Sequence, residues 1–206
     1  MSQYRSPLFD LGPGVKNLII INLLIWLFDI TNYNKHLIGI DLHEMFGLHY
    51  WELDSFNPFQ MITYMFLHDR SGIMHVFFNM FNLWMFGAAM ENFWGTRRFI
   101  IYYLACGIGA GLLYAMIPGL HVTVGASAAV YGLLLAFGMT FPNEYIYLYF
   151  LMPIKTKWFI GGMIAIELIQ GIFYSYDGIA HFAHLGGMLI GFLLILWWRK
   201  HPFSRI

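Results

Sequence analysis

The sequence predicts an all-α polytopic membrane protein, a bundle of six transmembrane helices, and three observations carry this prediction. Hydrophobic residues make up 59% of the 206 residues and charged residues only 11%, whereas a soluble domain carries about 25% charged residues. Six apolar runs approach the roughly 20 residues that a helix needs to cross a bilayer. The basic residues gather in alternate connections between these runs, a pattern typical of oriented membrane helices.

These six spans form a single membrane domain that covers residues 1–206. The first connection, residues 33–72, mixes aromatic residues, histidines and acids, and its stretch HEMFGLHYWEL is expected to lie on the lipid bilayer surface as short amphipathic helices. Eleven basic residues balance eleven acidic ones, so no nucleic-acid partner is expected. The predicted transmembrane helices are residues 16–32, 73–92, 98–118, 125–142, 157–174 and 179–199.

Orientation follows from the basic residues, which cytoplasmic loops carry in excess. With the amino terminus in the cytoplasm, nine of the eleven basic residues face inward, and only Lys35 and Arg70 face outward. We therefore expect both termini in the cytoplasm and the connection 33–72 outside. The inward residues are Arg5, Lys16, Arg97, Arg98, Lys155, Lys157, Arg199, Lys200 and Arg205.

Polar side chains inside membrane spans are costly, and here several gather toward the outer side. His75 and Asn79 lie four residues apart on one face of the second span. Ser127 opens the fourth span within GASAAVYG, and His184 lies near the start of the sixth within AHLGGMLIG. With this orientation, Ser127 and His184 both belong to the outer part of the membrane.

Small residues predict that the fourth and sixth spans pack backbone to backbone, because glycine and alanine let helices approach closely. Such packing would bring His184 within reach of Ser127. The two stripes are Ala128, Gly132 and Ala136 on the fourth span, and Gly187 and Gly191 on the sixth.

This combination of residue types fits nucleophilic catalysis. A serine hydroxyl is a poor nucleophile until a base, usually histidine, takes its proton. The oxyanion that then forms needs preorganised donors. The Asn79 amide and a ring N–H of His75 are suitable, as is the backbone N–H of Ser127 at a helix start. No metal ion or cofactor is needed for this chemistry.

Less specific interpretations of the same residues stay open. A membrane serine often only packs, and membrane histidine and asparagine often only join helices. His181 and His184 form a possible metal pair, and HEMFGLH approaches the HExxH zinc pattern with its second histidine at the wrong offset. Glu167 with the histidines would also suit a small transporter, but the sequence has no convincing discontinuous half-helices in paired halves.

Five segments, taken in order, resemble the rhomboid intramembrane serine proteases of the six-helix bacterial type. The resemblance runs from about Pro58 to Arg199. It implies a rhomboid-like bundle in a bacterial inner (plasma) membrane and a serine endopeptidase that cleaves transmembrane protein substrates near the outer membrane face. The segments are QMITYMFLH (60–68), HVFFN (75–79), ENFWGTRRF (91–99), GASAAVYG (125–132) and AHLGGMLIG (183–191).

The resemblance also implies roles for single residues. Ser127 matches the nucleophile of the family's GxSx motif, and His184 matches the base of its AHxxGxxxG motif, which together make a dyad without an acid. His75 and Asn79 match the oxyanion residues of its HxxxN motif. The remaining residues expected to line the site are Gly125, the first glycine of GxSx, Tyr131, the aromatic residue beside the base, and also Ala128 and His181.

Two positions depart from the family's pattern. Ala128 stands where a glycine usually follows the serine, which adds a methyl group near the oxyanion site and removes no catalytic group. Phe59 and Gln60 replace a Trp-Arg pair in the first loop, which leaves the contacts of that loop open. The alternative function is a rhomboid-like protein that binds membrane clients without cutting them, for which Ala128 is the only support.

Overall fold

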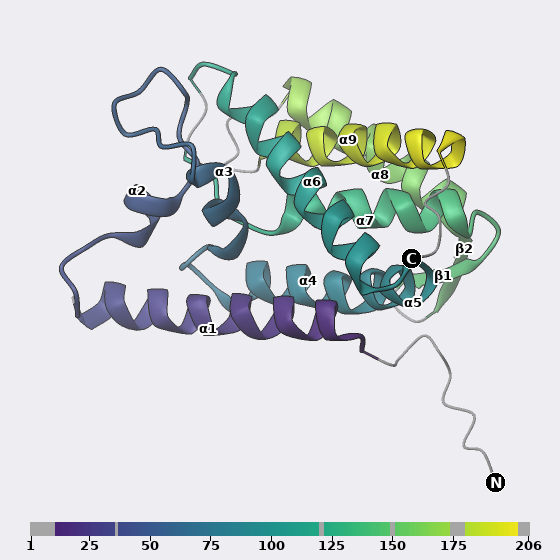
Figure 1. Ribbon diagram of the computed structural model, residues 1–206, viewed down its shortest axis with the longest axis horizontal. Coiled ribbons are helices and arrows are strands. Elements are labelled where there is room, and N and C mark those ends of the chain that lie inside the picture. Colours follow the sequence, from purple (N-terminus) through teal and green to yellow (C-terminus); the bar gives the residue numbers. More distant parts are fainter. Residues whose placement is uncertain (1–10, 36, 120–121, 149–150, 174–179, 202–206) are drawn as a thin grey trace, which may run out of the picture.

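Five helices are long and apolar enough to cross a membrane within residues 11–35, 37–119, 122–148, 151–173 and 180–201, which the computed structural model describes. A shorter apolar helix, α7 (Ser127–Thr140), lies among them (Figure 1). The prediction of a helical membrane protein is therefore confirmed. The five helices are α1 (Pro13–Lys35), the span Ile73–Trp94, α6 (Thr96–Ala115), α8 (Thr156–Phe173) and α9 (His181–Lys200).

The helices differ from the predicted spans by a few residues at their ends, for local reasons. The helix α1 begins at Pro13, three residues before the expected start, because proline suits the first helical position. The helix α6 ends at Ala115, before Pro118, whose ring disfavours helical backbone at the preceding residue. The predicted ends at residues 174 and 179 lie outside the described residues.

The helix α7 lies inside the bundle. Most of its side chains are buried, and it packs against α6, α8 and α9, which shield it from lipid. Its 14 residues make a helix about 21 Å long, whereas the hydrocarbon core of a bilayer is about 30 Å thick. We therefore expect Ser127, its first residue, to lie within the thickness of the bilayer.

The span Ile73–Trp94 consists of three parts. A turn of π-helix, η3 (Leu83–Gly87), joins α4 (Ile73–Asn82) to α5 (Ala88–Trp94). Such turns locally change which face a helix presents, and they are frequent at functional sites. Gly95 separates α5 from α6 with a φ of 81°, a left-handed conformation that favours glycine.

The structure adds an element that the sequence analysis did not predict, a two-stranded antiparallel hairpin between α7 and α8. The strand β1 (Tyr145–Leu148) pairs with β2 (Met152–Lys155), so that Tyr145 lies opposite Lys155 and Tyr147 opposite Pro153. The run YIYL is aromatic and branched, which favours strands. The hairpin lies at the end of the bundle opposite α2 and α3 (Figure 1).

At the same end as the hairpin, Glu91 of α5 holds the start of α1. Its buried carboxylate accepts hydrogen bonds from the backbone N–H groups of Gly14 and Val15, each at 2.8 Å. These amides belong to the first turn of α1, where no intrahelical acceptor exists. Thr96 of α6 donates its hydroxyl to the same carboxylate at 2.6 Å. One acid therefore joins three helices.

The connection between α1 and α4 contains the short helices α2 (Leu42–Phe46) and α3 (Gln60–Thr63), followed by the 3₁₀ turn η2 (Tyr64–Phe66). We call it the outer connection, after the side of the membrane on which the basic residues predict it. The side chain of Gln60 is 2% exposed and organises this segment. Its amide donates to the carbonyls of Met45 at 3.2 Å and Ser55 at 2.9 Å. The Gln60 that departs from the family's pattern is thus a buried structural residue of this connection.

The outer connection also fixes the chain just before α7. Leu48 and Thr123 exchange two backbone hydrogen bonds at 3.0 and 3.1 Å. The N–H of Gly125 donates to the carbonyl of Tyr64 at 2.9 Å. The place of Ser127, two residues later, is therefore set by residues far away in the sequence.

The helices α7 and α9 touch backbone to backbone at Gly187. A side chain at Gly187 would clash with the carbonyl of Ala128, so only glycine fits there. Gly191, expected against the same helix, instead faces Tyr102 of α6, whose hydroxyl group occupies the space that a side chain would need. Because α9 packs against both α6 and α7, one glycine of its stripe meets each neighbour.

Candidate active site

Ser127 and His184 lie side by side at the start of their two helices. The Ser127 Oγ is 2.8 Å from the His184 Nε2, although the residues are 57 positions apart. Ser127 is the first residue of α7, and His184 belongs to the first turn of α9. His184 is 7% exposed. The two groups are close enough for the hydroxyl to donate its proton to the imidazole.

The backbone before Ser127 makes room for a second histidine. Gly125 has a φ of 131°, which side-chain-bearing residues rarely adopt. A Cβ at Gly125 would lie 3.0 Å from the Cε1 and 3.1 Å from the Nε2 of His75. The absence of this carbon lets the Nε2 edge of the His75 ring approach the chain next to Ser127.

The ring of Tyr131 holds the plane of the His184 imidazole. The two rings are stacked, with centroids 4.3 Å apart and planes inclined by 11°. Tyr131 lies one turn after Ser127 on α7, so the helix that carries the hydroxyl also carries the ring that packs on the base. The stacking thereby fixes the plane of the imidazole, within which its Nε2 meets the Ser127 Oγ.

The tautomer of His75 follows from its neighbour in the outer connection. The backbone N–H of Asp69 donates to the His75 Nδ1 at 3.0 Å. That nitrogen is therefore the acceptor of the neutral ring, and the proton lies on Nε2. The Nε2–H group points toward the backbone at Gly125, beside Ser127, where it is available as a hydrogen-bond donor.

Asn79 lies one turn after His75 on α4. Its side chain is buried, and its Nδ2 donates to the His75 carbonyl at 2.9 Å. An amide nitrogen has two N–H groups, so this bond positions the side chain and leaves a second donor. Asn79 lines the same cavity as Ser127 and His75.

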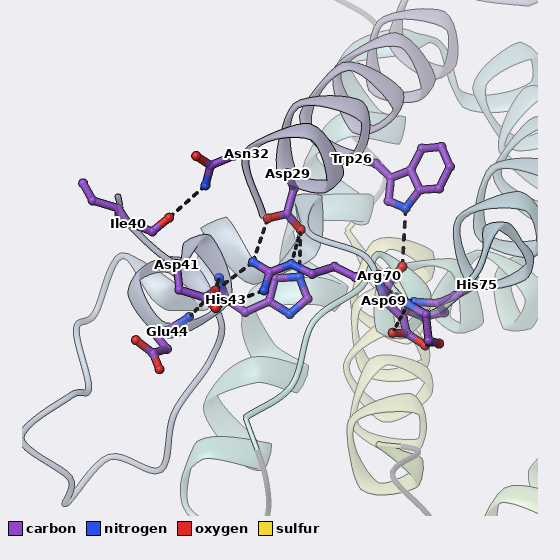
Figure 2. Close-up of polar contacts among 11 residues, drawn as sticks. Trp26, Asp29, Asn32, Ile40, Asp41, His43, Glu44, Asp69, Arg70 and His75 are labelled. Atoms are coloured by element: carbon purple, nitrogen blue, oxygen red, sulfur yellow. Dashed lines mark hydrogen bonds and ion pairs between the residues drawn. The ribbon is translucent and has the colours of Figure 1, made fainter. Parts of the chain in front are cut away.

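A polar cluster behind His75 joins the outer connection to α1 (Figure 2). The Arg70 guanidinium bonds the carboxylates of Asp29 on α1 at 2.8 Å and Asp41 at the start of α2 at 2.7 Å. The hydrogen bond from Arg70 lowers the pKa of Asp41 to about 2. Trp26 of α1 also donates its indole N–H to the carbonyl of Asp69 at 3.4 Å. The segment whose amide contacts His75 is therefore held from α1.

A cavity of about 830 Å³ opens beside the serine and the two histidines. Ser127, His75, Asn79 and His184 are among its polar lining residues, and Tyr131 also lines it. Its other walls are mainly apolar and come from α4, α7 and α8, with Phe78, Leu134 and Phe159 among their residues. The cavity thus combines a hydroxyl in contact with a histidine and walls suited to an apolar chain.

Three residues expected to line the site lie behind this cavity wall. Gly125 gives space to the ring of His75. Ala128 directs its carbonyl at the backbone of α9. His181 is 2% exposed and places its Nδ1 2.7 Å from a carboxylate oxygen of Glu167. Each supports a site residue from behind and does not border the cavity itself.

Glu167 is the site residue that the sequence analysis did not assign. It lies on α8, is 3% exposed, and its Oε2 is 3.0 Å from the Nδ1 of His184. A carboxyl group within a membrane span is costly and signals a role, but the sequence did not say which histidine it would meet. Only the packing of α8 against α9 brings the two together.

The two histidine stretches that the sequence offers as possible metal sites lie in different regions of the fold. Glu167, His181 and His184 present ligand atoms within 4.8 Å of one another, the one such group of three within the part of the chain that the structure describes. In HEMFGLH, by contrast, His43 bonds Asp29 at 2.9 Å, and His49 bonds the carbonyl of Glu44 at 2.9 Å. The two histidines of that stretch do not converge on one point.

Comparison with known proteins matches residues 55–201 to the Rhomboid domain. The chain is 38% identical to RHOMBOID-like protein 6, mitochondrial, of Arabidopsis thaliana over 66% of its length and 42% of that protein. It is 33% identical to Rhomboid protease GluP of Bacillus subtilis (strain 168) over 65% of its length and 24% of that protein. With Putative rhomboid protease YdcA of the same bacterium, identity is 30% over 84% of the chain and 75% of that protein. The chain thus spans less than half of the first two relatives.

Proposed function

This chain belongs to the rhomboid family, and we propose that it is an intramembrane serine endopeptidase that uses Ser127 as nucleophile and His184 as base. The observation that carries the proposal is the 2.8 Å contact between the Ser127 Oγ and the His184 Nε2 beside a cavity. Family members named as proteases add support. The apolar helices make the chain an integral membrane protein.

In the proposed reaction, the Ser127 Oγ attacks the carbonyl carbon of a peptide bond, and its proton passes to the His184 Nε2. The carbonyl π electrons move to the oxygen and form an oxyanion. When the electrons return, the C–N bond breaks and the leaving amine takes the proton from His184. A water molecule then attacks the acyl group by the same route and frees Ser127.

The oxyanion would be stabilised by donors that are in place before the reaction, which is the arrangement that lowers such barriers most. His75 offers its Nε2–H, because its Nδ1 already accepts the Asp69 amide. Asn79 offers its second amide N–H. The Ser127 amide belongs to the first turn of a helix, where backbone donors have no intrahelical acceptor.

Transmembrane protein segments are the proposed substrates. A protein of the bilayer meets its substrates there, and the apolar walls that α4, α7 and α8 contribute to the cavity suit a segment arriving from lipid. Because α7 is short, we expect Ser127 to lie inside the bilayer and cleavage to occur within the membrane, near its outer face. We expect the outer face because most basic residues gather at the opposite, cytoplasmic side in the predicted orientation.

A fluorophosphonate probe tests whether Ser127 is an activated nucleophile. Purified protein should be labelled once, at Ser127, and Ser127→Ala and His184→Ala should each abolish both labelling and cleavage of a transmembrane reporter. The double variant should be no worse than either single one, because nucleophile and base act as a unit. Ser55→Ala, which removes a hydroxyl bonded to His49, is the matched control.

Three outcomes would contradict the proposal. Labelling that persists in Ser127→Ala would place the nucleophile elsewhere. A reporter that the wild-type protein binds but never cuts would favour the client-binding alternative. Loss of cleavage in EDTA with recovery on adding zinc would show metal-dependent chemistry at the group of Glu167, His181 and His184.

A further inference from the structure

A buried acid lies on the far side of the proposed base. Glu167 places one carboxylate oxygen, Oε2, 3.0 Å from the Nδ1 of His184 and 2.7 Å from the Nδ1 of His181. All three side chains are buried, with exposed fractions of 3%, 7% and 2% in that order. The structure therefore contains a continuous line of contacts from Ser127 through His184 to Glu167.

This line of contacts determines the tautomer of His184. An ionised carboxylate only accepts hydrogen bonds, so a ring nitrogen that bonds it must carry a proton. With its proton on Nδ1, the neutral His184 ring has its lone pair on Nε2, the nitrogen that lies 2.8 Å from the Ser127 Oγ. That is the tautomer a general base needs, because the opposite one presents an N–H to the serine.

The second histidine holds the acid in place. His181 precedes His184 by one turn of α9, and the planes of the two rings are inclined by 89°, with centroids 6.2 Å apart. Both Nδ1 atoms therefore approach the same oxygen of Glu167 from different directions. A carboxylate fixed by two donors loses little freedom when one of them gains charge.

We propose that Glu167 is a positioning residue that sets the tautomer of His184 and stabilises the imidazolium formed when His184 takes the serine proton, with His181 orienting Glu167. This inference rests on the proposed function and deepens it, since it adds an acid to a pair for which the resemblance implied none. The carboxylate charge opposes the positive charge that appears on the ring during attack, which favours the transition state over the resting enzyme.

Glu167→Gln tests the role with almost no change in volume. The glutamine amide can donate to the His184 Nδ1 and so move the ring proton to Nε2. We expect kcat to fall by about 10²–10⁴-fold, the range for general base catalysis, with KM nearly unchanged. Glu167→Asp keeps the carboxylate and should recover part of kcat. Ile166→Val, at an exposed neighbouring position of α8, is the matched control.

The tautomer itself can be read without any substrate. We propose two-bond ¹H–¹⁵N correlation spectra of ¹⁵N-histidine-labelled protein in detergent with EDTA, with the His184 signals assigned by a His184→Phe variant. The wild-type ring should carry its proton on Nδ1, and Glu167→Gln should shift it to Nε2. This measurement separates the role of Glu167 from the proposed protease function. A protein that cleaves nothing would still show the Nδ1–H ring if Glu167 sets the tautomer.

The inference is overturned if the wild-type His184 carries its proton on Nε2. This test uses only the wild-type protein, so it does not depend on whether a variant folds. It is also overturned if Glu167→Gln keeps the Nδ1–H ring together with wild-type kcat. A third contrary result is that the His181 and His184 signals differ with and without EDTA, since a bound cation would then take the place of the ring protons.

Discussion

His68, next to the site, is a buried histidine whose two ring nitrogens have no hydrogen-bond partner among the described residues. Its side chain is fully buried, and its ring centroid lies 5.3 Å from that of His75. Burial, with a smaller effect of His75, lowers the pKa of His68 from 6.5 to about 3. His68 is therefore neutral at physiological pH, and its ring packs beside that of His75 as an uncharged group.

This pKa predicts how the stability of the protein depends on pH. Between pH 6.5 and 3 the unfolded chain binds a proton at His68 that the folded protein excludes, so the free energy of unfolding falls as the pH falls, by about 1.4 kcal/mol per unit. His68→Leu should flatten the decline. The measurement is thermal unfolding in detergent from pH 6.5 to 4.5, above the range in which Asp41 titrates. Equal slopes for both proteins would contradict the prediction.

The oxyanion role of Asn79 can be tested against a neighbour that makes the same local bond. Asn79→Ala should lower kcat by about 10²–10³-fold if the amide is a main donor. Asn82 also lines the cavity, and its Nδ2 donates to the carbonyl four residues before it, that of Phe78, at 2.7 Å. Asn82→Ala is therefore the control and should keep most activity. If kcat for reporter cleavage falls equally in both variants, Asn79 has no specific role as an oxyanion donor.

At the level of helices, the proposed chemistry depends on the contact between α7 and α9. Gly187→Ala would force a methyl group against the carbonyl of Ala128 and push the two helix starts apart. A displacement of about 1 Å can cost roughly 10²-fold in rate, so we expect at least that loss of kcat, with a lower melting temperature.

Gly161→Ala is the matched control for this substitution. A Cβ at Gly161 on α8 meets nothing within 4 Å, and alanine is favoured over glycine in helices by about 0.5–1 kcal/mol. Reporter cleavage and thermal stability in detergent would be measured for both variants. If Gly187→Ala behaved like Gly161→Ala, the helices would not be in backbone contact, and the Ser127–His184 pair would lose its structural basis.

The cluster around Arg70 fastens the outer connection to α1, and breaking it should loosen the whole segment. Arg70→Met leaves the fully buried Asp29 carboxylate with His43 as its one remaining ion-pair partner among the described residues. Removing one member of a buried ion pair lowers the free energy of unfolding by about 3–5 kcal/mol. We expect a loss at the lower end of that range, because His43 still bonds the Asp29 carboxylate. Thermal unfolding in detergent measures the loss.

The double variant Asp29→Asn/Arg70→Met separates charge from packing. Because it removes the buried charge together with its partner, it should be more stable than Arg70→Met alone. Catalytic activity should follow the same order, since Asp69, the neighbour of Arg70, holds the His75 ring. A single variant as stable as the wild type would show that the cluster does not fasten the connection.

For the whole molecule, the structure separates two ends of the bundle. The outer connection and the starts of α7 and α9 lie at one end, and the β1–β2 hairpin lies at the other (Figure 1). Among the described residues, Lys155 and Lys157 lie at or beside the hairpin end, and Arg70 lies at the other. This separation makes the orientation predicted from the basic residues directly testable.

Cysteine accessibility in intact cells tests that orientation. In a Cys106→Ala background, Asn57→Cys should react with an impermeant thiol reagent from outside, and Asn143→Cys should not, because both positions are exposed but lie at opposite ends. The native Cys106 is fully buried, so its removal only simplifies the labelling. The reverse pattern would place Ser127 on the cytoplasmic side and overturn the charge argument.

Several properties of this protein were determined by the sequence alone, because they depend on composition and local spacing. The excess of apolar residues indicates helices in lipid, since a backbone in hydrocarbon must satisfy its own hydrogen bonds. The four-residue spacing of His75 and Asn79 places both on one helix face. The motifs around Ser127 and His184 pointed to the family before any contact was known.

Only the tertiary structure decided which side chains meet across helices. Glu167 stood in the sequence as an unexplained acid, and the packing of α8 on α9 brings it to His184. Gly191 shares a stripe with Gly187 yet meets a different helix, because α9 packs between α6 and α7. Spacing along one helix fixes the face on which a residue lies, but the partner of that face depends on how every helix packs at once.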